Sequence, residues 1–281
     1  GRERRVRVDE SGGSVGVGEK TDGDRVQRLP ERVAARAVFP GALGALNAVG
    51  ALMGEGDTPS MLEFVDSGTI KRRSALGDFG LDDSAGAILL AQADGGDAVA
   101  VLERFTELAE GEGASEVVFS DDPADSAELV MIRRKVGDAL EHHANLNGGG
   151  EWVEDVCVPR EKLPAFYEGL VEIRETFATE ISLAGHAGDG NLHPTVFFDT
   201  ADEDSVERAR GAFDAIMRLG LDLGGTITGE HGIGFLKRGW LAEELDEGAA
   251  AIHLAVKRAL DPQGILNPGK VLADFQLAPS R

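Results

Sequence analysis

The stretch ISLAGHAGDGNLHPTVFF, residues 181–198, decides the fold of this chain. It contains two strand-like runs, 181–185 and 192–198, separated by glycine-rich residues that favour a turn. Two strands joined by a short turn pair antiparallel, so His186 and His193, at either end of the turn, come close in space. Because buried polar side chains need partners, we interpret this turn as the wall of a reactive pocket.

A second glycine-rich segment of the same character is GGTITGEHGIG, residues 224–234. The two segments hold three of the six histidines, and we expect them to form two walls of one site. His186, His193 and Glu230 offer two imidazoles and a carboxylate, a set that suits zinc, manganese or iron and leaves a coordination position open. We expect Asp189 to orient an imidazole. His231 is either a member of the site or a packed core histidine.

Apolar periodicity in the rest of the chain predicts alternating strands and helices. The expected strands are 33–39, 61–65, 86–92, 115–119 and 152–158. The expected helices are 42–53, 97–110, 121–142, 159–177, 202–223 and 246–260. The order β-α-β-β-α-β therefore occurs about twice, which predicts an α+β fold with a largely antiparallel sheet and helices on one face.

Composition limits the class of protein. A net charge of -22 over 281 residues argues against nucleic acid and anionic membrane surfaces as partners. No run approaches the ~20 apolar residues that an integral membrane segment needs. The single cysteine, Cys157, cannot form an internal disulfide, and the alternating run around it predicts a small strand residue rather than a nucleophile. We expect a cytoplasmic protein, either free or peripheral at the membrane.

The first thirty residues differ from the remainder. Residues 1–30 are rich in Gly, Asp and Arg, and the chain begins without methionine. We interpret them as the poorly ordered end of another unit, and the chain as a piece of a longer or processed protein. Residues 31–281 then form one domain.

Two further charged residues lie in apolar surroundings. Arg133 flanks the apolar stripe of the predicted helix 121–142, where its guanidinium either reaches a pocket and holds a carboxylate through two hydrogen bonds or stays on a solvated face. Glu63 lies in the apolar strand 61–65, where it is either an edge residue or a buried partner.

Three motifs in this order and spacing resemble the C-terminal domain of FAD-linked oxidases. They are the segments at 185–194 and 224–234 and LDPQGILNPGK at 260–270, supported by TPSMLEFVD at 58–66 and by the helix of Arg133. The family includes glycolate oxidase subunits, D-lactate dehydrogenases and D-2-hydroxyglutarate dehydrogenases, and the resemblance covers about residues 33–272. It implies a ferredoxin-like α+β cap domain set over a flavin that a separate domain holds.

The resemblance also implies roles for individual residues. His186, His193 and Glu230 match the positions that bind a divalent metal, zinc, manganese or iron. His231 matches the general base, and Arg133 matches the residue that grips the substrate carboxylate. The residues expected to approach the FAD are Glu230, His231, Gly232, Asn267 and Lys270.

The chain departs from the family pattern in three ways. We expect this chain to lack the FAD-binding domain, because residues 1–30 match only its tail, so the resemblance implies an FAD-binding domain or subunit as partner. Thr195 stands where several relatives have asparagine, which leaves its substrate contact in question. Val153 stands where the D-2-hydroxyglutarate enzymes have lysine, which favours a monocarboxylate such as lactate or glycolate.

The function implied is therefore the substrate-binding and catalytic cap domain of an FAD-dependent 2-hydroxy acid dehydrogenase or oxidase, inactive as an isolated fragment. Two alternatives stay open: a non-catalytic metal-binding interaction module and a metal-dependent hydrolase. The electron acceptor and the oligomeric state, a homo-oligomer included, stay open as well.

Overall fold

The computed structural model describes residues 7–8, 14–15, 32–56, 58–74, 84–120, 122, 126, 131, 133–272 and 275. The chain divides into two compact units, Gly1–Glu31 and Arg32–Arg281. In the first, β1 (Arg7–Val8) and β2 (Ser14–Val15) pair antiparallel. The other residues of 1–30, which we expected to be poorly ordered, lie outside the described ranges.

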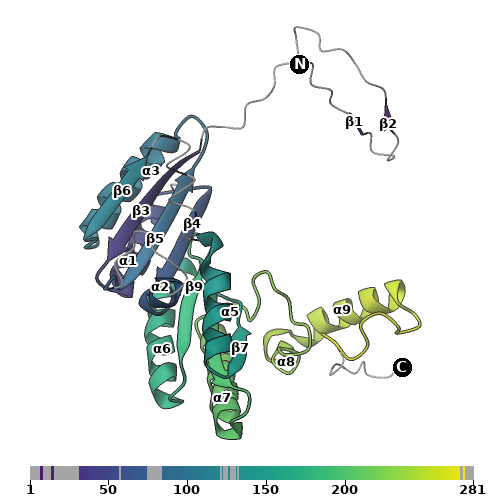
Figure 1. The fold of residues 1–281 in the computed structure, drawn as a ribbon. Helices are drawn as coiled ribbons and strands as arrows, with labels where there is room; N and C mark the ends of the chain where they lie inside the picture. The colour runs from purple at the N-terminus through teal and green to yellow at the C-terminus, as the bar shows by residue number, and fades with distance from the viewer. Residues whose placement is uncertain are drawn as a thin grey trace. The chain divides into compact units, whose positions relative to one another are not determined.

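The second unit is built on an eight-stranded sheet (Figure 1). The first half of the sheet contains β3 (Val33–Phe39), α1 (Ala42–Gly54), β4 (Met61–Asp66), β5 (Ala87–Ala93), α3 (Ala98–Gly111) and β6 (Glu116–Ser120). Its strands lie in the order β6-β3-β5-β4, and each neighbouring pair is antiparallel. The ferredoxin-like order that the sequence suggested is therefore present in this half.

The second half repeats the β-α-β-β-α-β order, but its last strand is shortened to a single bridge. It contains β7 (Gly149–Val153), β8 (Val156–Cys157), the 3-10 turn η1 (Arg160–Lys162), α6 (Leu163–Thr176), β9 (Ile181–His186), β10 (Asn191–Asp199) and α7 (Glu203–Asp222). β10 pairs antiparallel with β9 on one side and with β7 and β8 on the other. The first three strands of this half therefore lie in the same relative order as β3, β4 and β5 of the first half. Where a fourth strand would follow α7, only Thr226 bridges to Cys157. The halves join where β4 pairs with β9.

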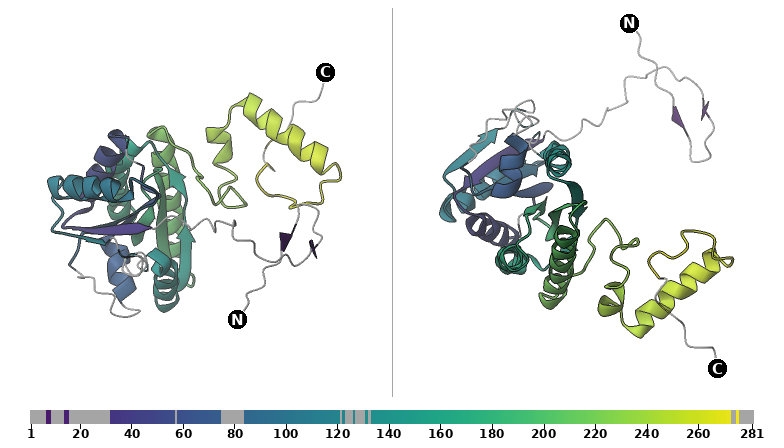
Figure 2. Two further views of the ribbon diagram at one scale, coloured as in Figure 1. Left: turned by 90° about the horizontal axis from the view of Figure 1, so that it is seen from above. Right: turned by 60° about the horizontal axis from the view of Figure 1, so that its bottom comes forward.

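Four helices cover one face of the sheet. α3, α1, α6 and α7 pack side by side in that order, as Figures 1 and 2 show. Alternate strand residues point toward them, because successive side chains of a strand lie on opposite faces. Phe64, Leu89, Leu183 and Val196 are buried in the core between these helices and the sheet. The predicted antiparallel sheet covered by helices is confirmed.

Of the described helices, α2 (Ser67–Ser74) and α5 (Val136–Leu146) lie on the opposite face and cover it in part. Ile70 of α2 packs with Val65 and Ile88, and Leu140 of α5 packs with Phe197. Sequence periodicity did not predict α2, because its residues are mainly polar. The carboxylate of Asp66 accepts hydrogen bonds from the backbone N–H and the hydroxyl of Thr69, both at 2.8 Å, which holds the first turn of this helix.

Two other elements differ from the sequence prediction. The predicted strand 152–158 is divided into β7 and β8, because Glu154 and Asp155 turn inward and are buried. The predicted helix 121–142 is described mainly over α5, which ends at Leu146, and much of its beginning lies outside the described residues.

The last described helices are α8 (Leu241–Glu244) and α9 (Glu247–Leu260). Asp246 caps α9 by accepting the N–H of Ala249 at 2.7 Å. Ile252, Val256 and Leu260 are spaced four residues apart on α9 and are exposed, which leaves an apolar stripe in solvent. None of the helices in the described ranges combines the length and apolar character that crossing a bilayer requires.

Candidate functional site

The β9–β10 hairpin brings the two predicted imidazoles together on the partly covered face. His186 ends β9 and His193 lies in β10, with Asn191 opposite His186 and Ala184 opposite His193 in the ladder. Both side chains point away from the four-helix layer. Their ring centroids are 5.2 Å apart, with the rings nearly perpendicular.

Two glycines permit the close approaches that build the site. Gly190, in the hairpin turn, has φ +84°, and a side chain there would meet the carbonyl oxygen of Val158 at 2.1 Å. A Cβ at Gly229 would lie 2.5 Å from the side chain of Asn191. Only glycine therefore lets the turn that carries Glu230 press against β10.

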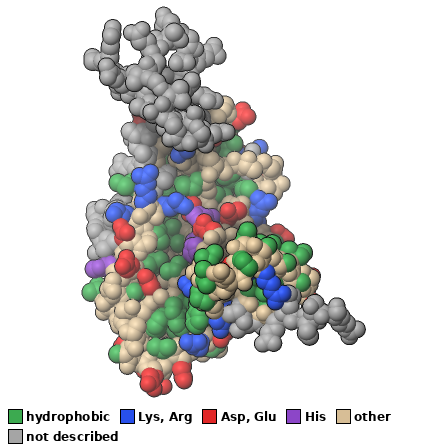
Figure 3. Space-filling view, turned by 90° about the vertical axis from the view of Figure 1, so that its right-hand side faces the viewer, with side chains coloured by type: hydrophobic (Ala, Val, Ile, Leu, Met, Phe, Trp, Pro, Cys, Tyr) green, Lys and Arg blue, Asp and Glu red, His purple; other side chains and the backbone are tan. Residues whose placement is uncertain are grey.

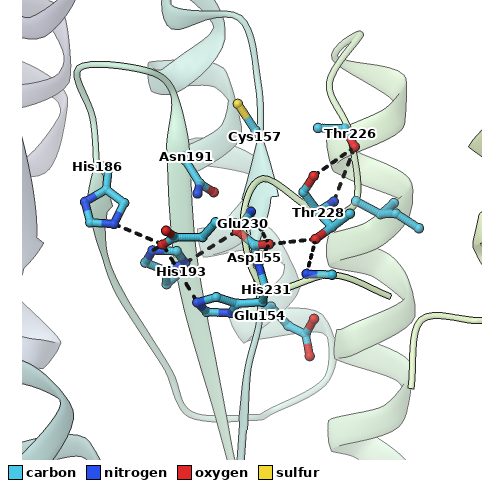
Figure 4. Close-up of polar contacts among 12 residues, drawn as sticks. Glu154, Asp155, Cys157, His186, Asn191, His193, Thr226, Thr228, Glu230 and His231 are labelled. Atoms are coloured by element: carbon cyan, nitrogen blue, oxygen red, sulfur yellow. Dashed lines mark hydrogen bonds and ion pairs between the residues drawn. The ribbon is translucent and has the colours of Figure 1, made fainter. Parts of the chain in front are cut away.

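Glu230 meets both imidazoles (Figure 4). Its Oε1 is 3.1 Å from His186 Nε2 and 3.3 Å from His193 Nε2. His231 stacks on His193 with centroids 4.8 Å apart and an 8° angle between the rings, and its Nε2 is 3.9 Å from Glu230 Oε1. The two glycine-rich segments thus share one site, and His231 is half-exposed at its edge rather than packed in the core.

Asp155 holds this second segment in place. Its Oδ2 accepts hydrogen bonds from the N–H groups of Glu230 at 2.9 Å and His231 at 2.7 Å, and from the Thr228 hydroxyl at 2.8 Å. Its Oδ1 lies 3.8 Å from His193 Nδ1. Burial alone would raise the pKa of Asp155, but the hydrogen bonds from this turn lower it below its ordinary value.

A buried ion pair lies next to Asp155. Lys237 Nζ is 3.4 Å from Glu154 Oε2, and it donates to the carbonyl oxygens of Asp155 at 3.2 Å and Ile227 at 2.8 Å. Burial raises the pKa of Glu154 to about 7, against the lowering effect of Lys237. Sequence reasoning missed both carboxylates. The available signal was two consecutive acidic residues inside an otherwise apolar run.

Glu63 reaches the site from the other half of the sheet. It lies opposite His186 in the β4–β9 ladder and is 6% exposed. Its Oε1 accepts a hydrogen bond from His186 Nδ1 at 2.8 Å and pairs with Arg133 Nε at 2.9 Å. Of the two interpretations open from the sequence, Glu63 is therefore the buried partner, and Arg133 is turned to the site while its side chain stays half-exposed.

Two cavities adjoin these residues. One of about 170 Å³ is lined by Glu63, Arg133, His186 and His193 together with apolar Val65, Val136 and Ala184. The other, of about 540 Å³, shares Glu63, Arg133 and His186 with the first. Its lining includes Arg32, Glu63, Arg133, His186 and Asp189. Figure 3 shows histidine side chains beside acidic ones near the middle of one face, with basic side chains around them.

The two imidazoles differ in their electrostatic surroundings. The hydrogen bond with Glu63 raises the pKa of His186. Burial, and then the proximity of His231 and His186, lowers the pKa of His193. A neutral imidazole is the form that binds a metal ion, so burial favours that form at His193.

The remaining predicted residues lie at varying distances from the histidines. Thr195 is buried two residues beyond His193 on the same face, and its hydroxyl has no hydrogen-bond partner within the described ranges. Gly232, at φ +81°, donates its N–H to the Thr228 hydroxyl at 2.8 Å and closes the turn. Asn267 and Lys270 are exposed.

The segment that carries Asn267 and Lys270 is attached to the site loop. The N–H of Val271 donates to the carbonyl oxygen of Gly234 at 2.8 Å, and Arg238 donates to the carbonyl oxygen of Gly269 at 2.7 Å. The third sequence motif therefore joins the second, although neither Asn267 nor Lys270 contacts the imidazoles.

Two residues have local structural roles. Asp189, which we expected beside an imidazole, stabilises the hairpin turn by accepting the N–H of Asn191 at 3.1 Å. Cys157 lies half-buried in β8, and burial raises the pKa of its thiol. A raised pKa disfavours the nucleophilic thiolate, in agreement with its prediction as a strand residue.

The nitrogens and oxygens at the centre of the site form a set that could hold a cation. The nearest ligand atoms of His186, His193 and Glu230 all lie within 4.8 Å of one another. Asp155, His193 and His231 form an overlapping set with the same spread. Carboxylates stand behind both imidazoles, as they commonly do behind metal-binding histidines.

Known protein families match this chain over most of its length. The model of "FAD linked oxidases, C-terminal domain" matches residues 28–271. The glycolate oxidase subunit GlcD of Bacillus subtilis is 34% identical over 217 residues, covering 76% of this chain and 45% of that protein. GlcD of Escherichia coli is 31% identical over 263 residues, covering 92% and 52%. A probable mitochondrial D-lactate dehydrogenase of Danio rerio is 31% identical over 261 residues, covering 88% and 50%.

Solved structures share the fold. p-Cresol methylhydroxylase with bound substrate matches with a TM-score of 0.65 at 13% identity, over 89% of this chain and 54% of that one. 4-Ethylphenol oxidase from Gulosibacter chungangensis matches with a TM-score of 0.58 at 17% identity, over 86% and 54%. This chain spans about half the length of the curated relatives it matches. By sequence and by fold, it belongs to the family of C-terminal domains of FAD-linked oxidases.

Proposed function

We propose that this chain is the substrate-binding and catalytic cap domain of an FAD-dependent 2-hydroxy acid dehydrogenase or oxidase that acts on a D-lactate-like or glycolate-like substrate. One observation carries the proposal. His186, His193 and Glu230 converge within 4.8 Å, with His231 and Arg133 on either side of them. The site thus combines a cation-binding set, a candidate base and a candidate carboxylate clamp.

The residues present fit a divalent metal. His186 Nε2, His193 Nε2 and Glu230 Oε1 would hold it, because two imidazoles and a carboxylate suit zinc, manganese or iron. Hydrogen bonding of Glu63 to His186 Nδ1 leaves Nε2 as the nitrogen that faces the other two ligands. A metal bound there would supply Lewis acidity, which lowers the pKa of a substrate hydroxyl.

Arg133 and His231 would act on different groups of the substrate, the carboxylate and the hydroxyl. Arg133 holds the carboxylate, because its planar guanidinium donates two parallel hydrogen bonds. His231 removes the hydroxyl proton at Nε2, the atom that lies 3.9 Å from Glu230 Oε1. FAD, held mainly by another part of the enzyme, would supply the hydride acceptor.

The exposed apolar stripe of α9 supports a partner for this domain. Ile252, Val256 and Leu260 are all more than half exposed, and exposed apolar patches commonly mark interaction sites. An FAD-binding domain or subunit would cover them and bring the flavin toward Gly232, Asn267 and Lys270. In this proposal residues 1–30 are the tail of that FAD-binding domain and residues 31–281 are the cap domain.

The smaller cavity favours a short substrate. Its volume is about 170 Å³, and Val65, Val136 and Ala184 line it beside Arg133. Apolar walls suit a hydrogen or a methyl group on the carbon that bears the hydroxyl, and they penalise a second carboxylate that finds no partner there. Val153 stands where related dicarboxylate enzymes have lysine, so this position also favours a substrate with a single carboxylate.

Flavin reduction tests this function. The protein, combined with its FAD-binding domain and a divalent metal, should lose its flavin absorbance band when D-lactate or glycolate is added without oxygen. His231→Ala should slow this step by about 100- to 10,000-fold, the usual contribution of a general base. His142→Ala, at an exposed histidine of α5, is the matched control. Reduction at the wild-type rate by His231→Ala would overturn the assignment of the base.

A further inference from the structure

We propose that Glu63 is a positioning residue that fixes the metal ligand His186 and the carboxylate clamp Arg133 in one arrangement. This inference rests on the proposed function and assigns a role to a residue outside both glycine-rich motifs. A single carboxylate oxygen would then set the spacing between the metal and the substrate carboxylate.

The position of Glu63 in the sheet makes this possible. β4 is the last strand of the first half and pairs with β9 of the second, with Glu63 directly opposite His186. Glu63 and Val65 point to the partly covered face, where the neighbouring buried side chains are apolar. A carboxylate so placed is costly unless it is hydrogen-bonded, and the contacts with His186 and Arg133 offset that cost.

The contact with His186 selects one form of its imidazole. Glu63 Oε1 lies 2.8 Å from His186 Nδ1, so this nitrogen carries the hydrogen that is donated. In the neutral ring the lone pair is then on Nε2, the nitrogen on the side of Glu230, whose Oε1 is 3.1 Å away. A metal bound there would take the place of the hydrogen that Nε2 donates to Glu230 in the protonated ring. Without Glu63 the ring is free to rotate or to carry its hydrogen on Nε2, and either change removes a metal ligand.

The contact with Arg133 fixes the guanidinium. Nε pairs with Glu63 at 2.9 Å, which restrains a side chain that is otherwise 45% exposed. A bidentate grip on a substrate carboxylate would use the Nη1–Nη2 edge of the same group. Because Glu63 Oε1 contacts both groups, the clamp and the metal ligand cannot move apart independently.

This coupling suits substrates whose hydroxyl and carboxylate are on adjacent carbons. A 2-hydroxy acid presents both groups at one fixed separation, whereas a 3-hydroxy acid places them one carbon further apart. Glu63 therefore favours the 2-hydroxy class through geometry, without touching the substrate.

Metal affinity, measured without any turnover, is the first test. Calorimetric titration of the purified protein with Mn²⁺ alone should show binding about 10- to 100-fold weaker in Glu63→Ala, the usual effect of losing a residue that orients a ligand. Glu63→Gln keeps the size of the side chain and an acceptor oxygen, so its affinity should fall less. If Glu63→Ala fails to fold, a weakened Glu63→Gln still supports the proposal, and wild-type affinity in Glu63→Gln overturns it.

Asp66→Asn is the matched control. Asp66 is a buried carboxylate of the same strand, but it faces the opposite side, where its Oδ2 pairs with Arg174 at 2.8 Å. Its loss should lower stability and leave the Mn²⁺ affinity unchanged. Wild-type affinity in a folded Glu63→Ala would overturn the role of Glu63 while the metal site stands. Absence of Mn²⁺ and Zn²⁺ binding by the wild-type protein would instead overturn the metal site of the proposed function.

Substrate affinity tests whether Glu63 also positions Arg133. In protein saturated with Mn²⁺, Glu63→Ala should bind D-lactate at least about tenfold more weakly, because a hydrogen bond to a charged group has been lost. Asp66→Asn should bind D-lactate like the wild type. Equal D-lactate affinity in the wild type and Glu63→Ala would overturn the link to Arg133.

Discussion

The two halves of the sheet share one strand order but differ at its last position. In the first half β6 completes four paired strands, whereas in the second half the corresponding strand is reduced to the bridge between Thr226 and Cys157. The backbone beyond Thr226 is therefore free to turn, and Asp155 holds that turn over the sheet. The candidate site lies where a turn replaces a strand.

The halves also differ in what their strands bury. Every buried residue of β3 and β5 is apolar, while β10 buries Asn191 and Thr195, and the break between β7 and β8 buries Glu154 and Asp155. From its strands, the first half supplies Glu63 to the imidazole of His186 and Val65 to the wall of the smaller cavity. One half is thus mainly a support, and the other carries the polar groups that a ligand would meet.

The largest expected effect comes from removing the two imidazoles of the second half. His186→Ala and His193→Ala should each reduce the metal content from near-stoichiometric to background, because two remaining ligands do not form a stable site. Elemental analysis of protein purified without chelators measures this, with His142→Ala as the control. A metal-free wild type, or a mutant with full metal content, would contradict the assignment.

A pair of buried aspartates, one in each half, gives the next largest effect. Asp66→Ala and Asp155→Ala should each lower the free energy of unfolding by about 3 to 5 kcal/mol, because buried charged or hydrogen-bonding partners are left without an acceptor. Only Asp155→Ala should also lose Mn²⁺ affinity, since only Asp155 holds the Glu230 turn. Urea denaturation and Mn²⁺ titration of both variants measure this. Equal Mn²⁺ affinities of the two variants would show that Asp155 is no more important for the metal site than Asp66.

The hairpin and its two histidines could be predicted from the sequence because the signals are local. A turn of glycines between two apolar runs fixes which residues lie opposite one another. The repeated β-α-β-β-α-β order was readable for the same reason, since each element has its own periodicity. A bridge of a single residue has no periodicity, so the reduced fourth strand at Thr226 was not predicted.

The contacts that organise the site depend on distant parts of the chain. Asp155 binds the Thr228–His231 turn, and Glu63 meets His186 only because β4 pairs with β9 across the junction of the halves. No local pattern specifies either contact. For this reason the sequence left two possible positions for Glu63, at an edge or as a buried partner, and it predicted no role for Asp155.

Glu154 should make stability depend on pH. Burial raises its pKa from 4.5 to about 7 in the folded protein, so between these values the folded state binds a proton that the unfolded state has lost. The free energy of unfolding therefore falls as pH rises through this window, by up to about 3 kcal/mol, and changes no further above it. Urea denaturation at pH 5 and pH 8 should show this fall.

Glu154→Gln provides the comparison for that measurement. Its amide has the size of the carboxyl group and would lie beside Lys237 in the same way, but it does not titrate. The difference between wild type and variant should grow from pH 5 to pH 8 in favour of the variant. Parallel profiles would show that the buried pair of the second half does not control this dependence.

The smallest expected effect concerns Val153, at the end of β7. Val153 lies opposite Thr195 on the face that carries His193, and it is 46% exposed. Val153→Lys should change the free energy of unfolding by no more than about 0.5 kcal/mol, as surface substitutions usually do. The added charge should raise kcat/KM for D-2-hydroxyglutarate relative to D-lactate by about two- to fivefold, the size of an exposed ion pair.

Val153→Met, which is of comparable length and uncharged, separates charge from shape in that measurement. A ratio that rises in Val153→Lys and not in Val153→Met would extend the substrate-facing surface of the second half as far as β7. The same ratio in both variants would limit that surface to β9, β10 and the Glu230 turn. The smaller cavity, with its apolar walls, would then account for substrate size without help from β7.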